Sequence, residues 1–151
     1  MKGLVIYDSI YGNTKAVAEM IAEGIRAEGH EAIIQSAKDD LHEKLDLDLI
    51  LIGSPTRMGR MTGPSKKLMK KLSKSSWTKP VGFFDTVMPG VVEKKGSTAA
   101  QRLYDLAKDE GLDAHAPVFH ATVTGMRGPL QGDTADTVKA FVREFLASMR
   151  H

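Results

Sequence analysis

Runs of apolar residues alternate along the chain with segments in which apolar residues recur at helical spacing. Five short runs are expected to be strands, and the third and fourth lack polar residues at their centres, as strands buried on both faces do. Strands that alternate with helices predict a parallel α/β sheet. The expected strands are residues 4–7, 32–36, 47–52, 81–84 and 117–123.

The helical segments carry apolar stripes that would pack against this sheet. Pro64 suits the first turn of the helix after the third strand, and Asp133 or Thr134 begins the last helix. Residues 97–111 form a further capped helix, whereas the polar connection 39–44 has room for only a turn or two of helix. Five βα units are therefore expected. The apolar stripes contain Val17, Ile21 and Ile25; Leu68 and Leu72; and Val138, Phe141, Val142, Phe145 and Met149.

The composition of the chain excludes several functions for a protein with this sheet. A chain of 151 residues, 42% of them hydrophobic, suits one compact domain over residues 1–151. Its 21 Lys and Arg against 19 Asp and Glu are too balanced for a protein that holds nucleic acid through many phosphate contacts. The absence of cysteine excludes disulfides, iron–sulfur ligation and thiol nucleophiles, so any redox chemistry requires a bound cofactor.

The start of the chain and its hydropathy bear on its location. A strand is expected within four residues of Met1, without a charged and apolar leader before it. No apolar run approaches the roughly 18 residues that a membrane span requires. The lack of cysteine fits a reducing compartment. We therefore expect a cytoplasmic protein that does not bind membranes.

Short polar segments follow three of the expected strands, at residues 8–14, 53–61 and 85–90. The carboxyl ends of parallel strands share one edge of the sheet, where ligands bind at the point of strand-order reversal. In the first segment, the Ser9 and Thr14 hydroxyls and free backbone N–H groups would meet where a helix dipole begins. This pattern predicts a phosphate site, with a plain capped turn as the alternative. No Walker A or GxGxxG motif occurs, so a triphosphate or a Rossmann-type dinucleotide is not expected.

Two of these segments resemble motifs of the flavodoxin family. The first, Ser9-Ile10-Tyr11-Gly12-Asn13-Thr14, is similar to the family's phosphate loop, Ser/Thr-x-Ser/Thr-Gly-Asn-Thr, and departs from it at Tyr11. The second, Pro55-Thr56-Arg57-x-Gly59-x-Met61, is similar to the quinone-reductase branch. The resemblance runs over the whole chain in the order and length of its elements. It implies a single flavodoxin-like α/β domain with a five-stranded parallel sheet of order 2-1-3-4-5, helices on both faces, and FMN as cofactor.

The resemblance also implies roles for residues around the flavin. The isoalloxazine ring would lie between the second and third polar segments, with Thr56 and Arg57 at its polar edge and Met58 over one face. Gly59 would permit a peptide flip toward ring nitrogen N5. The implied cofactor-binding residues are Ser9, Ile10, Tyr11, Gly12, Asn13, Thr14, Pro55, Thr56, Arg57, Met58, Gly59, Asp85, Thr86 and Val87.

Simpler interpretations of the same residues stay open. Met58 and Gly59 also suit an ordinary exposed turn. Arg57 also suits a solvated surface cation that pairs with Asp85. If both charges lie near the ring, Asp85 would disfavour a negative charge on the reduced flavin and Arg57 would favour it.

Other clusters bear on metals and partners. His115 and His120 lack the further ligands that a metal site needs, so no metal is expected. The loop 124–129 resembles the Gly- and Arg-containing loop of diiron-linked flavodoxin domains and would line the outer edge of the site. Lysines crowd the helix after the third strand, as a solvated face or as a docking surface for an acidic redox partner. They are Lys66, Lys67, Lys70 and Lys71, with Lys74 and Lys79 nearby.

The resemblance leaves two functions to distinguish. A minimal chain without a second substrate domain favours a low-potential electron carrier that meets redox partner proteins, such as a reductase, a ferredoxin or an acceptor enzyme. The alternative, supported by the second motif, is an FMN-dependent NAD(P)H:quinone oxidoreductase. A receiver-type signalling module shares the order of elements, but the third strand ends in Gly53-Ser54 without a phospho-acceptor aspartate. We expect a monomer or a weak homo-oligomer.

Overall fold

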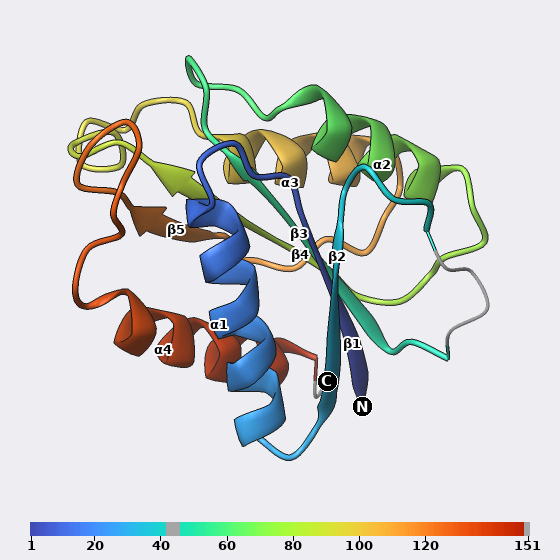
Figure 1. Ribbon diagram of the computed structural model, residues 1–151. Helices are drawn as coiled ribbons and strands as arrows, with labels where there is room; N and C mark the ends of the chain where they lie inside the picture. Colours follow the sequence, from blue (N-terminus) through green and yellow to red (C-terminus); the bar gives the residue numbers. More distant parts are fainter. Residues whose placement is uncertain (42–45, 150–151) are drawn as a thin grey trace.

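The computed structural model describes residues 1–41 and 46–149 and contains one parallel β-sheet (Figure 1). Its strand order is β2-β1-β3-β4-β5, which confirms the order that the family resemblance implies. The strands are β1 (Lys2–Tyr7), β2 (Glu31–Ser36), β3 (Leu49–Pro55), β4 (Val81–Val87) and β5 (Phe119–Thr122). The helices in the described residues are α1 (Asn13–Ala27), α2 (Gly63–Ser73), α3 (Ala99–Asp109) and α4 (Thr134–Ser148).

Helices cover both faces of the sheet, so the protein has three layers (Figure 1). On one face, Val17 of α1 packs with Phe141 and Phe145 of α4 in a buried cluster. On the other face, Leu68 of α2 and Leu103 of α3 belong to a second buried cluster. The central strands are therefore enclosed on both sides, and this explains why β3 and β4 lack polar alternation at their centres.

The connection from β2 to β3 brings the chain back across β1. The strand order reverses at this point, because β1 lies between β2 and β3 in the sheet. The expected short helix in residues 39–44 falls partly on residues 42–45, which lie outside the described residues. Within the described residues, no helix stands between β2 and β3, so the fold has four βα pairs there rather than five. The loops after β1 and β3 diverge and leave space above the strand ends.

The strands β3 and β4 extend further than the sequence pattern predicts. The expected ends were residues 52 and 84, whereas the strands end at Pro55 and Val87. The ladder continues because Ser54 pairs in register with Asp85, and both residues are fully buried. Polar residues within a strand are accommodated here by side-chain hydrogen bonds, which the hydrophobic pattern does not reveal.

Gly53 allows an aromatic ring to pass directly over β3. A Cβ atom at this position would lie 2.1 Å from Cε2 of Phe84, far inside the contact distance of two carbon atoms. Phe84 is completely buried on the same face as α1 and α4. The glycine therefore holds two central strands in close packing just below the carboxyl edge of the sheet.

Candidate functional site

Four loops enclose a cavity of about 290 Å³ at the carboxyl edge of the sheet. These loops, residues 8–15, 55–62, 86–97 and 123–130, are called the mouth loops below. The cavity lies where the strand order reverses, which is the usual position of a ligand crevice in such a sheet. Its lining residues are Ser9, Ile10, Tyr11, Asn13, Thr14, Pro55, Thr56, Arg57, Met58, Thr86, Val87, Met88, Val123 and Met126.

The loop after β1 leads directly into α1 through Gly12, whose φ of 91° is in the left-handed region that glycine adopts easily. The Ser9 Oγ accepts hydrogen bonds from the Gly12 and Lys15 backbone N–H groups at 3.1 and 3.3 Å. Among the described residues, the N–H groups of Asn13 and Thr14 have no acceptor. The positive end of α1 thus presents free donors to the cavity, with no acidic residue in its first turn.

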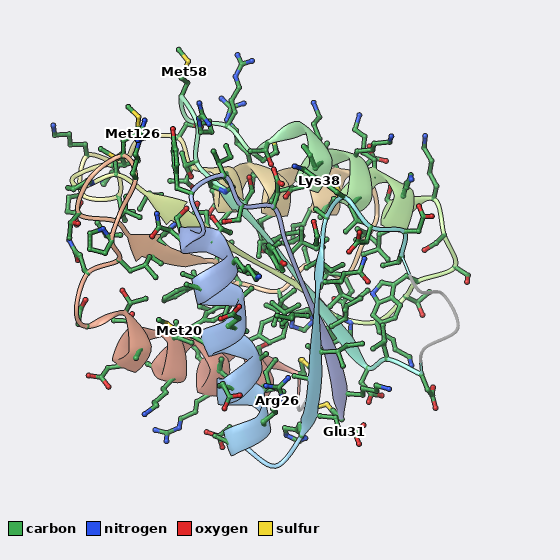
Figure 2. All side chains as sticks on the ribbon, in the orientation of Figure 1. Met20, Arg26, Glu31, Lys38, Met58 and Met126 are labelled. Atoms are coloured by element: carbon green, nitrogen blue, oxygen red, sulfur yellow. The ribbon has the colours of Figure 1, made fainter. Side chains whose placement is uncertain are left out.

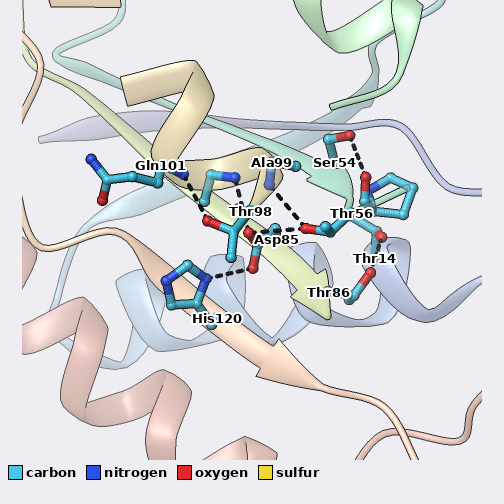
Figure 3. Close-up of polar contacts among 11 residues, drawn as sticks. Thr14, Ser54, Thr56, Asp85, Thr86, Thr98, Ala99, Gln101 and His120 are labelled. Carbon is cyan, nitrogen blue, oxygen red and sulfur yellow. Dashed lines mark hydrogen bonds and ion pairs between the residues drawn. The ribbon is translucent and has the colours of Figure 1, made fainter. Parts of the chain in front are cut away.

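Three contacts join this loop to neighbouring elements. The Thr14 and Thr86 hydroxyls lie 2.9 Å apart and are buried, so the start of α1 is joined to the end of β4 (Figure 3). Gly128 lies so close to Asn13 that a Cβ atom there would be 2.5 Å from the Asn13 Oδ1. The Arg127 guanidinium lies 5.7 Å from the centre of the Tyr11 ring. The loop after β5 therefore forms part of the site.

The loop after β3 contains a tight hairpin. The Arg57 N–H donates to the Arg60 carbonyl at 2.9 Å, and the Arg60 N–H donates to the Arg57 carbonyl at 3.0 Å. Met58 and Gly59, at the tip, have φ values of 51° and 78°. The Ser97 hydroxyl donates to the Gly59 carbonyl at 2.7 Å, which joins the hairpin to the loop before α3.

Asp85 is a fully buried carboxylate that lies beside the cavity rather than in its wall. Figure 3 shows its hydrogen bonds. One oxygen accepts hydrogen bonds from the Ala100 N–H at 2.9 Å and the Thr56 hydroxyl at 3.2 Å. The other lies 2.8 Å from the His120 Nδ1. The Thr56 hydroxyl also accepts from the Ala99 N–H at 2.9 Å. Asp85 therefore anchors Thr56 and the start of α3, where the helix dipole favours its negative charge.

The His120 imidazole lies in register with Asp85 on the adjacent strand β5, with 22% of its side chain exposed. Burial alone would disfavour its charged form, but the hydrogen bond to Asp85 and the negative charge of that carboxylate outweigh burial. The pKa of His120 is therefore raised above the ordinary value of 6.5. Arg57, by contrast, is exposed, and the interpretation that pairs it with Asp85 is wrong because His120 occupies that position.

Most of the residues predicted from the sequence lie in this cavity wall. The exceptions are Gly12 and Gly59, which shape the loops beside it, and Asp85, which lies behind Thr56. The loop 124–129 reaches the cavity through Met126, as its resemblance to diiron-linked domains predicts. The wall residues that the sequence did not single out are Met88 and Val123. Met88 directly follows β4, so its position after a strand was the available signal.

The fold and the site define a doubly wound α/β protein in which a helix N-terminus with free backbone N–H groups lies at the crevice beyond the strand ends. The sequence profile of the flavodoxin domain matches residues 4–125. The chain therefore belongs to the flavodoxin family, whose members typically bind FMN. In the described residues, no helix has the length and apolar character to cross a membrane.

Curated relatives carry two different descriptions. A flavodoxin of Aquifex aeolicus (strain VF5) is 38% identical over 81 residues, covering 50% of this chain and 42% of that protein. An NAD(P)H dehydrogenase (quinone) of Gluconacetobacter diazotrophicus is 37% identical over 81 residues, covering 40% of this chain and 41% of that protein. The chain thus matches less than half the length of these relatives.

Solved structures share the fold along nearly the whole chain. A flavodoxin from the domain Archaea has a TM-score of 0.81 and 23% identity, with full coverage of both chains. The rubredoxin oxygen:oxidoreductase of Desulfovibrio gigas has a TM-score of 0.74 and 19% identity, covering 99% of this chain and 37% of that one. The same fold therefore occurs both as a whole flavodoxin and as part of a longer protein.

Proposed function

We propose that this chain binds one FMN in the cavity and carries electrons between redox proteins. The observation that carries the proposal is the contrast between two helix N-termini at the same edge of the sheet. At α3, the hydroxyls of Thr98 and Thr56 and the carboxylate of Asp85 accept the first N–H groups. At α1, the corresponding donors of Asn13 and Thr14 are free among the described residues. The oxygens of a terminal phosphate would accept hydrogen bonds from these free N–H groups.

The residues around the crevice fit the rest of the cofactor. In the cavity wall, the apolar side chains of Pro55, Val87, Met88 and Val123 supply surface for a planar ring. Met58 would cover one ring face from the tip of the hairpin. When bound, FMN supplies the electron chemistry, since no side chain of this cysteine-free chain is suited to it. The protein binds and orients the cofactor and leaves an edge open for exchange.

A charge inserted beside the loop after β1 tests the phosphate assignment. Ile10 lines the cavity and is 46% exposed, so a polar replacement should not disturb the core. Ile10→Asp should weaken FMN binding on the order of tenfold through repulsion of the phosphate. Ile10→Asn is the matched uncharged control. Affinities measured by flavin fluorescence should differ between these variants for FMN but agree for riboflavin. Equal FMN affinities of the two variants would refute the assignment.

An NAD(P)H:quinone oxidoreductase is the second candidate, because one set of relatives bears that description. Hydride transfer requires the nicotinamide to lie against the flavin while a second phosphate-binding surface holds the dinucleotide. Among the helices in the described residues, α1 alone contributes residues to the cavity wall, and its free donors provide a single phosphate site there. We expect NADPH alone to leave bound flavin oxidised over seconds in a stopped-flow mixture. Rapid bleaching by NADPH followed by multiple turnovers with benzoquinone would instead establish the oxidoreductase.

A further inference from the structure

A line of hydrogen bonds leads from the cavity wall to the edge strand β5 (Figure 3). Thr56, on one of the mouth loops, lines the cavity and donates its hydroxyl proton to an Asp85 oxygen at 3.2 Å. The other Asp85 oxygen lies 2.8 Å from the His120 Nδ1. Neither Asp85 nor His120 belongs to the cavity wall. The line therefore connects the cavity to a titratable side chain that lies outside it.

The contact between Asp85 and His120 determines where the protons of the imidazole lie. A carboxylate only accepts hydrogen bonds, so the His120 Nδ1 carries a hydrogen in both charge states of the ring. The proton that the ring gains or loses is therefore on Nε2, which makes no hydrogen bond within the described residues. Because 22% of the side chain is exposed, this proton can exchange with water. Proton uptake at His120 thus changes the charge of the pair without breaking the contact.

The same hydrogen bonds restrict what Thr56 can offer to a ligand. Its hydroxyl proton is donated to Asp85, and its oxygen accepts the Ala99 N–H at 2.9 Å. One lone pair of this oxygen is left. As long as Asp85 is a carboxylate, Thr56 can therefore act toward a ligand in the cavity as an acceptor but not as a donor.

The elements around His120 bring one charge to it, that of Asp85. Within residues 1–41 and 46–149, Asp85 forms no ion pair with another cation, and its charge raises the pKa of His120. From α3, the uncharged Thr98 and Gln101 lie near the pair (Figure 3). Helix α4 packs on the opposite face of the sheet. The pair is therefore neutral when His120 is protonated and carries one negative charge when it is not.

Other charged groups of α3 and of the loops beside β5 contact other residues or line the groove between α2 and α3. They are Arg102 on Ser97, Asp105 on Gln101, Lys108 over Tyr104, Asp109 in the groove, His115 on Asp113, and Arg127 over Tyr11.

We propose that His120 is a positioning residue of the cavity, which acts through Asp85 on Thr56 and sets the charge behind the cavity wall by taking up a proton. Where the proposal concerns FMN it rests on the proposed function, and otherwise it rests on the hydrogen bonds. A cavity backed by a neutral pair accepts added negative charge on a ligand more readily than one backed by an uncompensated carboxylate. Beyond the pH dependence of the flavin itself, the preference for reduced FMN should therefore weaken as the pH rises through the pKa of His120.

NMR on the flavin-free chain tests the line of hydrogen bonds. The ring signals of His120 give its titration midpoint, and the Thr56 methyl and Ala100 amide signals should shift with that midpoint. Both signals should lose this step in His120→Gln and keep it in the control His115→Gln. The Met20 methyl, which packs on the opposite face of the sheet, should not follow this midpoint in any of these chains (Figure 2). A Thr56 signal that does not follow His120 would overturn the proposal.

The midpoint potential of the FMN-loaded chain as a function of pH tests the charge behind the wall. Below the pKa of His120, the ratio of the affinities for reduced and oxidised FMN should be on the order of fivefold higher in the unmodified chain than in His120→Gln. Above that pKa the two chains should agree, because both then hold an uncompensated Asp85. His115→Gln should follow the unmodified chain throughout. A merely structural role would give a difference that is the same at every pH, and that result would overturn the proposal.

Asp85→Asn provides a second variant with an effect of opposite sign. It removes the negative charge and nearly keeps the shape of the side chain. Above the pKa of His120, its preference for reduced FMN should be on the order of fivefold higher than that of the unmodified chain. Failure of the chain to take up FMN would refute the proposed function, and the NMR titration would still decide the role of His120. A lowered preference in both Asp85→Asn and His120→Gln would overturn the proposal.

Discussion

At the scale of single residues, the contact between His120 and Asp85 links proton binding to folding. The pKa of His120 is raised above 6.5 in the folded chain, because the hydrogen bond and the charge of Asp85 outweigh burial. A group whose pKa is higher when folded stabilises the folded state fully below its unfolded pKa. That contribution is lost as the pH rises through the folded-state pKa. The polar pair thus stabilises the edge of the sheet most under mildly acidic conditions.

Replacement of His120 by glutamine should remove this pH dependence while keeping a hydrogen-bond donor. The free energy of unfolding lost in His120→Gln should be largest below pH 6.5 and should shrink as the pH rises above it. Denaturant titrations at several pH values measure this difference. His115→Gln is the matched control, since His115 contacts the exposed Asp113 outside the site. A loss that grows with pH would contradict the expected sign.

Gly53 offers a second single-residue test, which concerns the space between β3 and the Phe84 ring rather than a charge. In Gly53→Ala the new methyl group would overlap the Phe84 ring, and the rearrangement should cost about 1–3 kcal/mol of unfolding free energy. Gly63→Ala is the control, since a Cβ atom at the start of α2 meets nothing within 4 Å. Urea unfolding of both variants checks the prediction. Equal stability of the two variants would mean that β3 and Phe84 pack less tightly than described.

At the scale of elements, α3 begins where several side chains accept its backbone donors. The Thr98 hydroxyl accepts from the Gln101 N–H at 3.3 Å. Thr98→Ala should therefore lower the free energy of unfolding by about 1 kcal/mol. Thr78→Ala, at an exposed threonine in the loop before β4, should have little effect. The comparison is made by denaturant titration, and a loss in both variants alike would remove the capping role.

The elements also show how far the sequence could predict the site. Apolar stripes located the helices, and the motif around Gly12 located the loop that reaches α1. The pattern ended β3 and β4 too early, because Ser54 and Asp85 are polar yet buried by hydrogen bonds. The contact of Asp85 with His120 depends on the register of β4 and β5, two strands separated by a helix. Residue types alone do not specify that register.

At the scale of the whole molecule, a ligand that binds only the folded chain stabilises it by mass action. FMN at 100 times its dissociation constant should add about 2.7 kcal/mol to the unfolding free energy. The Tm should therefore rise with FMN concentration in thermal unfolding experiments. Riboflavin, which lacks the phosphate, is the control and should raise the Tm less at equal concentration. Equal shifts with both ligands would show that the α1 donors do not contribute to binding.

The hydrogen bonds of the Ser9 hydroxyl affect the order in which the chain would fold and bind a cofactor. It accepts two backbone N–H groups of its own loop, as an anion oxygen would, and the loop therefore keeps its shape without help from outside. Ligand binding to such a preformed loop costs little conformational entropy, because the loop is already ordered. Folding and cofactor loading become separable events. Under the proposed function, the chain would fold first and bind FMN afterwards, so the amount of FMN-loaded protein would follow the supply of flavin.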